Sequence, residues 1–234
     1  MSDDRAPPAL VLLPGLDGTG ILFRPFVETL GASIDTQIVT YPAHQPLGYT
    51  ELEALVRKAL PGDRRFVVLG ESFSGPIAIR LGADPPQALV GIVLCVTFAR
   101  NPYPLLGWVA PWVGGVPVKS MPSWARAPFM WGAWTTERAR RESALATAAV
   151  SEAVLRHRIA AVLTVDEVQA LTRIGVPTLV LRASRDHVVP RAATELMIRA
   201  LPAAELVEIE GPHLLLQSCP SECATVVKRF MHGL

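Results

Sequence analysis

The stretch VVLGESFSGPIAIRL, residues 67–81, decides the fold. It begins as an apolar strand, turns sharply through small residues around Ser72, and continues as a helix. A strand, a Gly-x-Ser-x-small turn and a helix together expose a serine hydroxyl at the carboxyl end of the strand. Gly70 and Ser74 supply the small residues two positions before and after Ser72. Ser72 is the candidate nucleophile, and a tight turn with only a structural role is the alternative.

Apolar runs alternate with amphipathic segments on both sides of this turn. The predicted strands cover residues 9–15, 36–42, 65–70, 88–98, 176–184 and 204–210. The predicted helices cover residues 23–31, 49–60, 75–84, 190–201 and 219–234. Strands that are apolar throughout are buried on both faces, and helices between them favour parallel pairing. Right-handed crossovers then give an α/β fold with a doubly wound, mostly parallel sheet.

The alternating pattern breaks in the middle of the chain. Residues 101–173 first contain aromatic side chains, prolines and glycines, and then become helical and rich in alanine and arginine. Long insertions between sheet strands are usually functional. The sequence therefore predicts a core made of residues 1–100 and 174–234, with residues 101–173 forming a helical cap.

Two further residues could activate a serine hydroxyl, which is a weak nucleophile without a base. Asp186 follows the predicted strand 176–184, and His213 follows the predicted strand 204–210. The order Ser, Asp, His, with each residue in a loop at a strand end, is the order typical of this architecture. Asp166 is a rival acid, but no strand precedes it. The other histidines are in less suitable positions: His44, His157, His187 and His232.

A turn of small residues follows the first predicted strand, in the sequence LLPGLDGTG of residues 12–20. Its backbone N–H groups could bind a developing oxyanion, with Leu16 N–H and Phe73 N–H as the two donors. A phosphate-binding loop is the alternative. It is disfavoured because both the Gly-Lys-Ser/Thr signature and the G-x-G-x-x-G spacing are missing.

These four motifs, LLPGLDGTG, GESFSG, DHVVP and GPHLLLQSCP, resemble those of the α/β-hydrolase fold superfamily over nearly the whole chain. The resemblance implies Ser72 as nucleophile, Asp186 as acid and His213 as base. The HG dipeptide of many members is Pro14-Gly15 here. The resemblance also implies a sheet with one or two fewer edge strands than the full eight.

The cap is expected to determine the substrate. All five tryptophans fall in it: Trp108, Trp112, Trp124, Trp131 and Trp134. We expect an apolar substrate-binding cavity lined by Trp108, Trp112, Met130, Trp131 and Trp134. Alternatively, these side chains attach the cap to the core, or contact a lipid surface or a second subunit. The arginine run in residues 137–144 is either a solvated helix face or a site for a carboxylate or a phosphopantetheine carrier.

The expected activity is hydrolysis of a carboxylic ester with an apolar acyl or alcohol part, through an acyl-serine and without a metal or organic cofactor. A thioesterase or acyltransferase would form the same acyl-enzyme, and a non-catalytic small-molecule receptor is the third class. The substrate is expected to be a small ester or thioester, free or carrier-bound. The sequence leaves the oligomeric state open.

Composition excludes several other classes. The net charge of +1 gives no electrostatic basis for binding nucleic acid. The first residues, MSDDRAPP, do not resemble a signal peptide, and the longest apolar run, residues 88–99, is too short for a membrane span. Cys219 and Cys223 lack a second pair of zinc ligands nearby, and three cysteines cannot all pair. A cytoplasmic location is the expectation.

Overall fold

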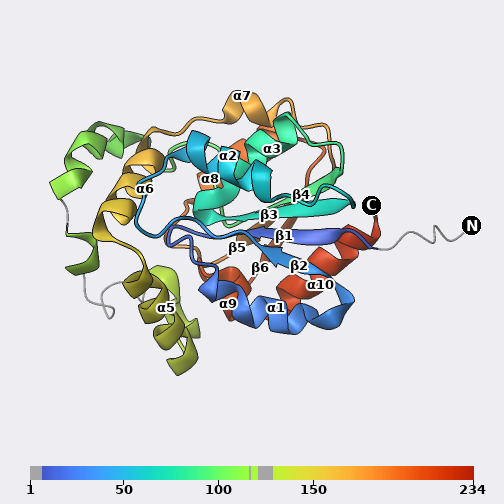
Figure 1. Cartoon of the computed structure of the whole chain (residues 1–234), viewed down its shortest axis with the longest axis horizontal. Coiled ribbons are helices and arrows are strands. Elements are labelled where there is room, and N and C mark those ends of the chain that lie inside the picture. The colour runs from blue at the N-terminus through green and yellow to red at the C-terminus, as the bar shows by residue number, and fades with distance from the viewer. Residues whose placement is uncertain (1–6, 116, 121–128) are drawn as a thin grey trace, which may run out of the picture.

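The computed structural model of the chain describes residues 7–115, 117–120 and 129–234 (Figure 1). Trp124 and the first six residues, on which the signal-peptide expectation partly rests, lie outside this range. The centre is a six-stranded parallel sheet with the order β2-β1-β3-β4-β5-β6. Its strands are β1 (Ala9–Leu13), β2 (Thr36–Ile38), β3 (Phe66–Glu71), β4 (Leu89–Cys95), β5 (Thr178–Ala183) and β6 (Glu205–Ile209). The predicted doubly wound α/β fold is confirmed.

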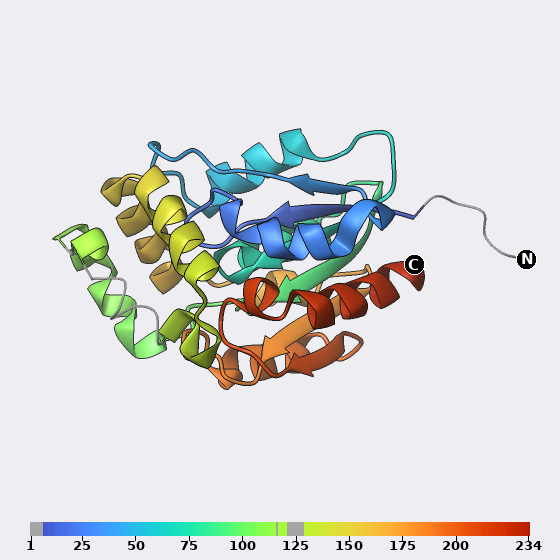
Figure 2. The ribbon, with the colours of Figure 1, turned by 90° about the horizontal axis from the view of Figure 1, so that it is seen from below.

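Helices cover both faces of the sheet (Figures 1 and 2). One face carries α2 (Tyr49–Ala59), α3 (Gly75–Ala83), α7 (Val168–Leu171) and α8 (Arg191–Ala200). The other carries α1 (Arg24–Leu30), α9 (Leu215–Ser218) and α10 (Pro220–His232). Each layer of helices closes its own hydrophobic cluster against the sheet.

Alternation along the central strands produces these two clusters. In β1, Val11 and Leu13 face the layer of α2 and α3, while Leu10 and Leu12 face the layer of α1 and α10. All four side chains are fully buried. Since burying one such side chain contributes about 1.5–3 kcal/mol, a strand that is apolar at every position stabilises both layers at once.

The edge strands are shorter than the sequence pattern predicts. β2 covers three residues, although the Val39 N–H beyond it still donates to the Leu12 carbonyl at 3.0 Å. β6 exposes Glu205, Leu206 and Glu208, as expected for a strand paired on one side only. The three cysteines are buried and free.

The insertion lies at the end of the sheet toward which the strands point (Figure 2). It contains the 3₁₀ segments Pro104–Gly115, Val118–Ser120 and Gly132–Trp134, followed by α5 (Glu137–Ala149) and α6 (Glu152–Thr164). Further along, α7 packs against α3 and α8, with Leu171 fully buried in their cluster. The last part of the range 101–173 therefore lies on the body of the protein. The division into core and cap remains a prediction.

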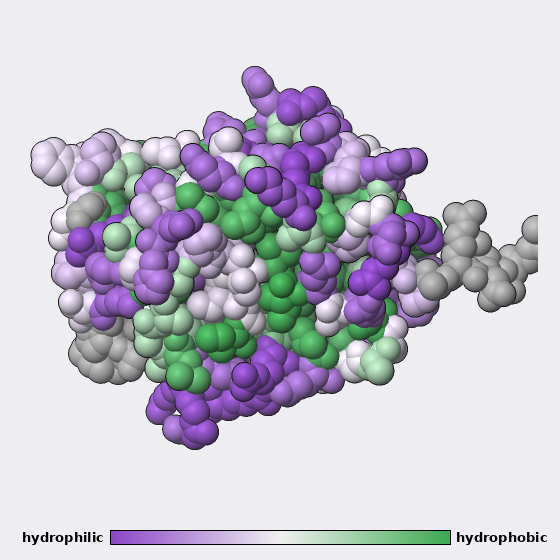
Figure 3. Space-filling model, in the orientation of Figure 1, coloured by the Kyte–Doolittle hydropathy of each residue, from purple (hydrophilic) through white to green (hydrophobic). Residues whose placement is uncertain are grey.

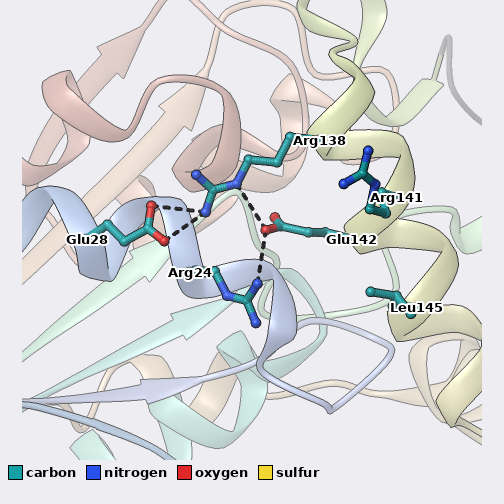
Figure 4. Close-up of a pocket in the computed structure, with 6 residues that line it drawn as sticks. All are labelled: Arg24, Glu28, Arg138, Arg141, Glu142 and Leu145. Atoms are coloured by element: carbon teal, nitrogen blue, oxygen red, sulfur yellow. Dashed lines mark hydrogen bonds and ion pairs between the residues drawn. The ribbon is translucent and has the colours of Figure 1, made fainter.

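Ion pairs join α5 of the insertion to α1 of the body (Figure 4). Arg138 contacts Glu28 at 2.9 Å and Glu142 at 3.0 Å, and Arg24 lies 3.8 Å from Glu142. These residues line a surface pocket of about 400 Å³. Solvent weakens the exposed pair of Arg138 and Glu28, whereas Glu142 is itself buried. In the described part of the chain, no helix has the length and hydrophobicity needed to cross a bilayer.

Helix α3 starts in direct contact with the chain that follows β4. A Cβ atom on Gly75 would lie 1.9 Å from Thr97 Oγ1, and Thr97 is itself buried. A Cβ on Gly70 would lie 2.7 Å from the Ser74 carbonyl oxygen. The turn between β3 and α3 therefore requires glycine on both sides for steric reasons.

We predict that Gly75→Ala lowers the free energy of unfolding by about 1–3 kcal/mol, because the added methyl group overlaps Thr97. Gly175→Ala is the matched control, since a Cβ there has no atom within 4 Å. Its effect should stay within about 1 kcal/mol. Urea titrations of the two variants and the wild type measure the difference. Equal stabilities for the two variants would contradict the close packing of α3.

Candidate active site

Three side chains that are far apart in the sequence form one hydrogen-bonded chain. Ser72 Oγ lies 2.9 Å from His213 Nε2, and His213 Nδ1 lies 2.9 Å from Asp186 Oδ2. Because a carboxylate can only accept, Nδ1–H donates to Asp186 and Nε2 accepts from the Ser72 hydroxyl. The three residues follow β3, β5 and β6, whose carboxyl ends meet at the same edge of the sheet.

The loop after β5 fixes the Asp186 carboxylate. Its Oδ1 accepts hydrogen bonds from the backbone N–H groups of Val188 at 2.7 Å and Val189 at 2.8 Å. Its Oδ2 is then available for His213. The side chains of Asp186 and His213 are almost completely buried. Burial of the Asp186 carboxylate is tolerated because both of its oxygens are hydrogen-bonded. The fixed carboxylate in turn holds the His213 imidazole in one orientation.

The backbone of Ser72 lies in the left-handed region, with φ of 48°. Val96, just beyond β4, also has a positive φ, of 44°. Such conformations cost about 1–3 kcal/mol each and persist only where the surroundings impose them. Next to Val96, the Thr97 hydroxyl donates to the Ser72 carbonyl. The strained segment after β4 therefore supports the strained turn after β3.

The predicted oxyanion turn has an available donor. Among the described residues, the Leu16 N–H has no hydrogen-bond partner. The Phe73 N–H belongs to the first turn of the helical segment that runs from Ser72–Ser74 into α3, where N–H groups have no intrahelical acceptor. The turn is closed by Gly18 N–H to the Gly15 carbonyl at 3.0 Å and by Thr19 N–H to Asp17 Oδ1 at 2.8 Å.

Ser74, which takes the place of the usual last glycine of the elbow, ties the elbow to this turn. Its hydroxyl donates to the Pro14 carbonyl and accepts from the Tyr41 hydroxyl, at 2.6 Å. Burial raises the pKa of Tyr41, so the phenol stays protonated and can donate. The sequence shows only that Ser74 is small enough for this position; both hydrogen-bond partners come from loops that are distant in the sequence.

The rival residues lie outside this arrangement. Asp166 is exposed and accepts from the Val168 N–H, at 3.1 Å. His44, His157, His187 and His232 are all exposed. Within the ranges that the structure describes, no cluster of His, Cys, Asp and Glu could hold a metal ion.

The residues expected to bind substrate are in different environments. Trp108 and Trp112 are 73% and 74% exposed, whereas Trp131 is buried. Trp134 packs on the hydrophobic cluster between the sheet and the layer of α1, α9 and α10. Met130 is partly buried, and its carbonyl accepts from the Leu214 N–H at 3.1 Å. The insertion therefore touches the chain directly beside His213 through Met130. A substrate-binding role for these five side chains remains a prediction.

The arginine run lies on an exposed helix face. Arg138, Arg140 and Arg141 are exposed on α5, and Figure 3 shows hydrophilic side chains covering the lower end of the molecule, where this helix lies. Arg138 is paired with Glu28 and Glu142, and Arg141 lies 3.9 Å from Glu137. The exposure of these arginines is compatible with a solvated helix face, and a site for a carboxylate or a phosphopantetheine carrier remains the alternative.

Glu71, immediately before Ser72, is a buried carboxyl group that sequence reasoning missed. Burial raises its pKa to about 7, while a hydrogen bond from Gln217 and the nearby His213 act in the opposite direction. Gln217 Nε2 donates to Glu71 Oε1 at 2.8 Å. The only sign of this role in the sequence is that Glu71 ends an apolar strand. Glutamate is rarely buried without a specific partner, so a glutamate in that position indicates one.

We predict that Glu71 makes the protein less stable as the pH rises. Its pKa of about 7 in the folded state exceeds the ordinary glutamate pKa of 4.5, so the folded state binds more protons than the unfolded state between these values. The free energy of unfolding should therefore fall across this window, by on the order of 3 kcal/mol from this group. Glu71→Gln should remove that contribution and keep the contact with Gln217.

Urea titrations of both proteins at pH 5 and pH 8 measure the effect. The wild type should lose more stability than Glu71→Gln between the two pH values. Parallel pH dependence of the two proteins would show that Glu71 does not titrate in this window.

Comparisons with known proteins identify the fold further. A search of curated proteins gave no significant match. Among solved structures, the enol-lactonase from Burkholderia xenovorans LB400 is 18% identical with a TM-score of 0.79, covering 98% of this chain and 93% of that one. A bromoperoxidase from Bacillus anthracis is 16% identical with a TM-score of 0.74, covering 96% and 92%. A bacterial membrane phospholipase A is 21% identical with a TM-score of 0.77, covering 97% and 79%.

At these identities the neighbours establish the fold alone, since one fold serves several chemistries. The family assignment rests on the sequence. A model of the alpha/beta hydrolase family matches residues 10–226, which include Ser72, Asp186 and His213. This chain therefore belongs to the alpha/beta hydrolase family.

Proposed function

We propose that this protein is a serine hydrolase that cleaves a carboxylic ester with an apolar acyl or alcohol part. The observation that carries the proposal is the hydrogen-bonded chain from Ser72 through His213 to Asp186, with both contacts at 2.9 Å. A nucleophile, a base and a group that orients the base are the minimum that acyl transfer by serine requires.

In the first half of the reaction, His213 Nε2 takes the Ser72 proton as Oγ attacks the carbonyl carbon of the ester. The tetrahedral intermediate collapses when His213 returns this proton to the leaving alcohol, and an acyl-serine remains. In the second half, His213 takes a proton from water as the water oxygen attacks the acyl carbon. His213 then returns this proton to Ser72 Oγ as the acid is released. Asp186 stabilises the imidazolium in both halves.

The negative charge of the tetrahedral intermediate requires donors at a fixed place. Leu16 N–H and Phe73 N–H are the proposed pair, one from the turn after β1 and one from the elbow. Losing one donor of this kind typically costs about 2.7–4 kcal/mol in the transition state. The Leu16 N–H has no partner in the part of the chain that the structure describes, which supports its assignment.

An apolar ester is favoured by the surroundings and by the relatives. Met130, a partly buried apolar residue, adjoins the loop of His213 through its backbone. Two similar structures are described as an enol-lactonase and a phospholipase A, and a third as a bromoperoxidase. In an apolar pocket, each buried methylene would add about 0.8 kcal/mol and so set a preference for acyl length.

We predict that the protein hydrolyses p-nitrophenyl esters with a kcat/KM that depends on acyl chain length. Ser72→Ala should lower kcat by on the order of 10³–10⁶-fold, because the acyl-enzyme cannot form. Ser221→Ala, at an exposed position of α10, is the matched control and should retain wild-type rates. Labelling by a fluorophosphonate should occur in the wild type and the control and be lost in Ser72→Ala.

A parallel series of acyl-CoA thioesters tests the acceptor and the leaving group. Faster turnover of thioesters than of oxygen esters would replace the ester-hydrolase proposal with a thioesterase. Equal rates for all acyl lengths would remove the apolar substrate and leave the serine mechanism. Unchanged hydrolysis and labelling in Ser72→Ala would contradict the proposed nucleophile.

A further inference from the structure

Arg158 is a cationic side chain buried inside the protein. It lies on α6 of the insertion and is completely inaccessible to solvent. Among the described residues, it forms no ion pair with a carboxylate, and its Nε–H has no hydrogen-bond partner. Burial lowers the pKa of its guanidinium, with Asp17 and Tyr41 acting in the opposite direction. Burying a charged side chain costs free energy unless hydrogen bonds compensate for the lost hydration.

The hydrogen bonds of Arg158 go to the predicted oxyanion turn. Its Nη1 donates to the carbonyl oxygens of Leu16 at 2.9 Å and Asp17 at 2.8 Å. Its Nη2 donates to the Pro42 carbonyl at 3.1 Å, which joins the turn to the segment after β2. Hydrogen bonds to the Leu16 and Asp17 carbonyls fix the orientation of the two peptide planes that directly follow the Leu16 N–H.

The same guanidinium also contacts the elbow. Its central carbon lies 5.9 Å from the centre of the Phe73 ring and 5.5 Å from the centre of the Tyr41 ring. Phe73 carries the second proposed oxyanion donor, and Tyr41 donates to Ser74. One side chain of the insertion therefore contacts both residues that would form the oxyanion hole.

The turn is shaped to admit this side chain. Gly18, which has φ of 72°, lies so close that a Cβ there would be 2.5 Å from Arg158 Nη1. The planar guanidinium can donate to several carbonyls and stack on rings at the same time, which the ammonium group of lysine cannot do. The combined contacts at position 158, including the close approach to Gly18, therefore require an arginine side chain.

We infer that Arg158 is a positioning residue, which holds the oxyanion turn in its productive geometry from the insertion by binding the Leu16 and Asp17 carbonyls and stacking on Phe73. The inference rests on the proposed serine-hydrolase function. It makes the oxyanion hole dependent on α6 as well as on the body of the protein. Arg158 itself does not touch the reacting atoms.

The test compares Arg158→Met with Arg138→Met. Both variants remove an arginine that joins the insertion to the body, but Arg138 binds Glu28 on α1 and does not reach the oxyanion turn. For a p-nitrophenyl ester, Arg158→Met should lower kcat by about 10–100-fold, somewhat less than the full loss of a donor, while KM changes little. The affinity for a trifluoromethyl ketone, which mimics the tetrahedral intermediate, should fall by a similar factor. Arg138→Met should keep both values within about twofold.

Arg158→Lys covers the case in which Arg158→Met does not fold. It keeps the charge but cannot bind all the carbonyls and rings, so kcat and ketone affinity should again fall together by about 3–10-fold. Melting temperatures separate these effects from stability. Folded Arg158 variants with wild-type kcat and ketone affinity would overturn the inference and leave Arg158 a structural link. A wild-type protein that neither hydrolyses esters nor reacts with fluorophosphonate would instead overturn the proposed function, and the inference with it.

Discussion

The left-handed turn at Ser72 is the constraint on which the rest of the site depends. The turn must be sharp enough to lift the hydroxyl off the end of β3, so glycine is required at positions 70 and 75. It must also be stable, and the hydrogen bond from Thr97 to the Ser72 carbonyl supports it from the neighbouring strand. Because β5 and β6 run parallel to β3, the loops that follow them bring Asp186 and His213 to the same edge.

The oxyanion turn is held from two directions. From the body, the Ser74 hydroxyl binds the Pro14 carbonyl and receives a hydrogen bond from Tyr41. From the insertion, Arg158 binds the carbonyls of Leu16 and Asp17 in the same turn. Preorganised donors stabilise a developing charge because they need not rearrange during the reaction. Under the proposed function, these buried polar contacts account for residues that an apolar core would not require.

Much of this arrangement could be predicted from the sequence, because apolar runs and small-residue turns report local geometry directly. The six strands follow from apolar runs, and the order of Ser72, Asp186 and His213 follows from where those runs end. The roles of Ser74 and Thr97 could not be predicted, since they depend on which loops meet in space. Arg158 carried a weak signal: it lies one turn after Val154 on the buried face of α6. Composition alone also cannot show that Trp108 and Trp112 are exposed to solvent while Trp131 is buried, because exposure depends on how the insertion packs.

A crystal structure of the protein after reaction with a fluorophosphonate would show directly whether Ser72 is the nucleophile. We predict a phosphorus–oxygen bond to Ser72 Oγ, with His213 still bound to Asp186. We also predict that the phosphoryl oxygen accepts hydrogen bonds from the N–H groups of Leu16 and Phe73. An adduct on another residue, or a phosphoryl oxygen directed away from both N–H groups, would contradict the proposed mechanism.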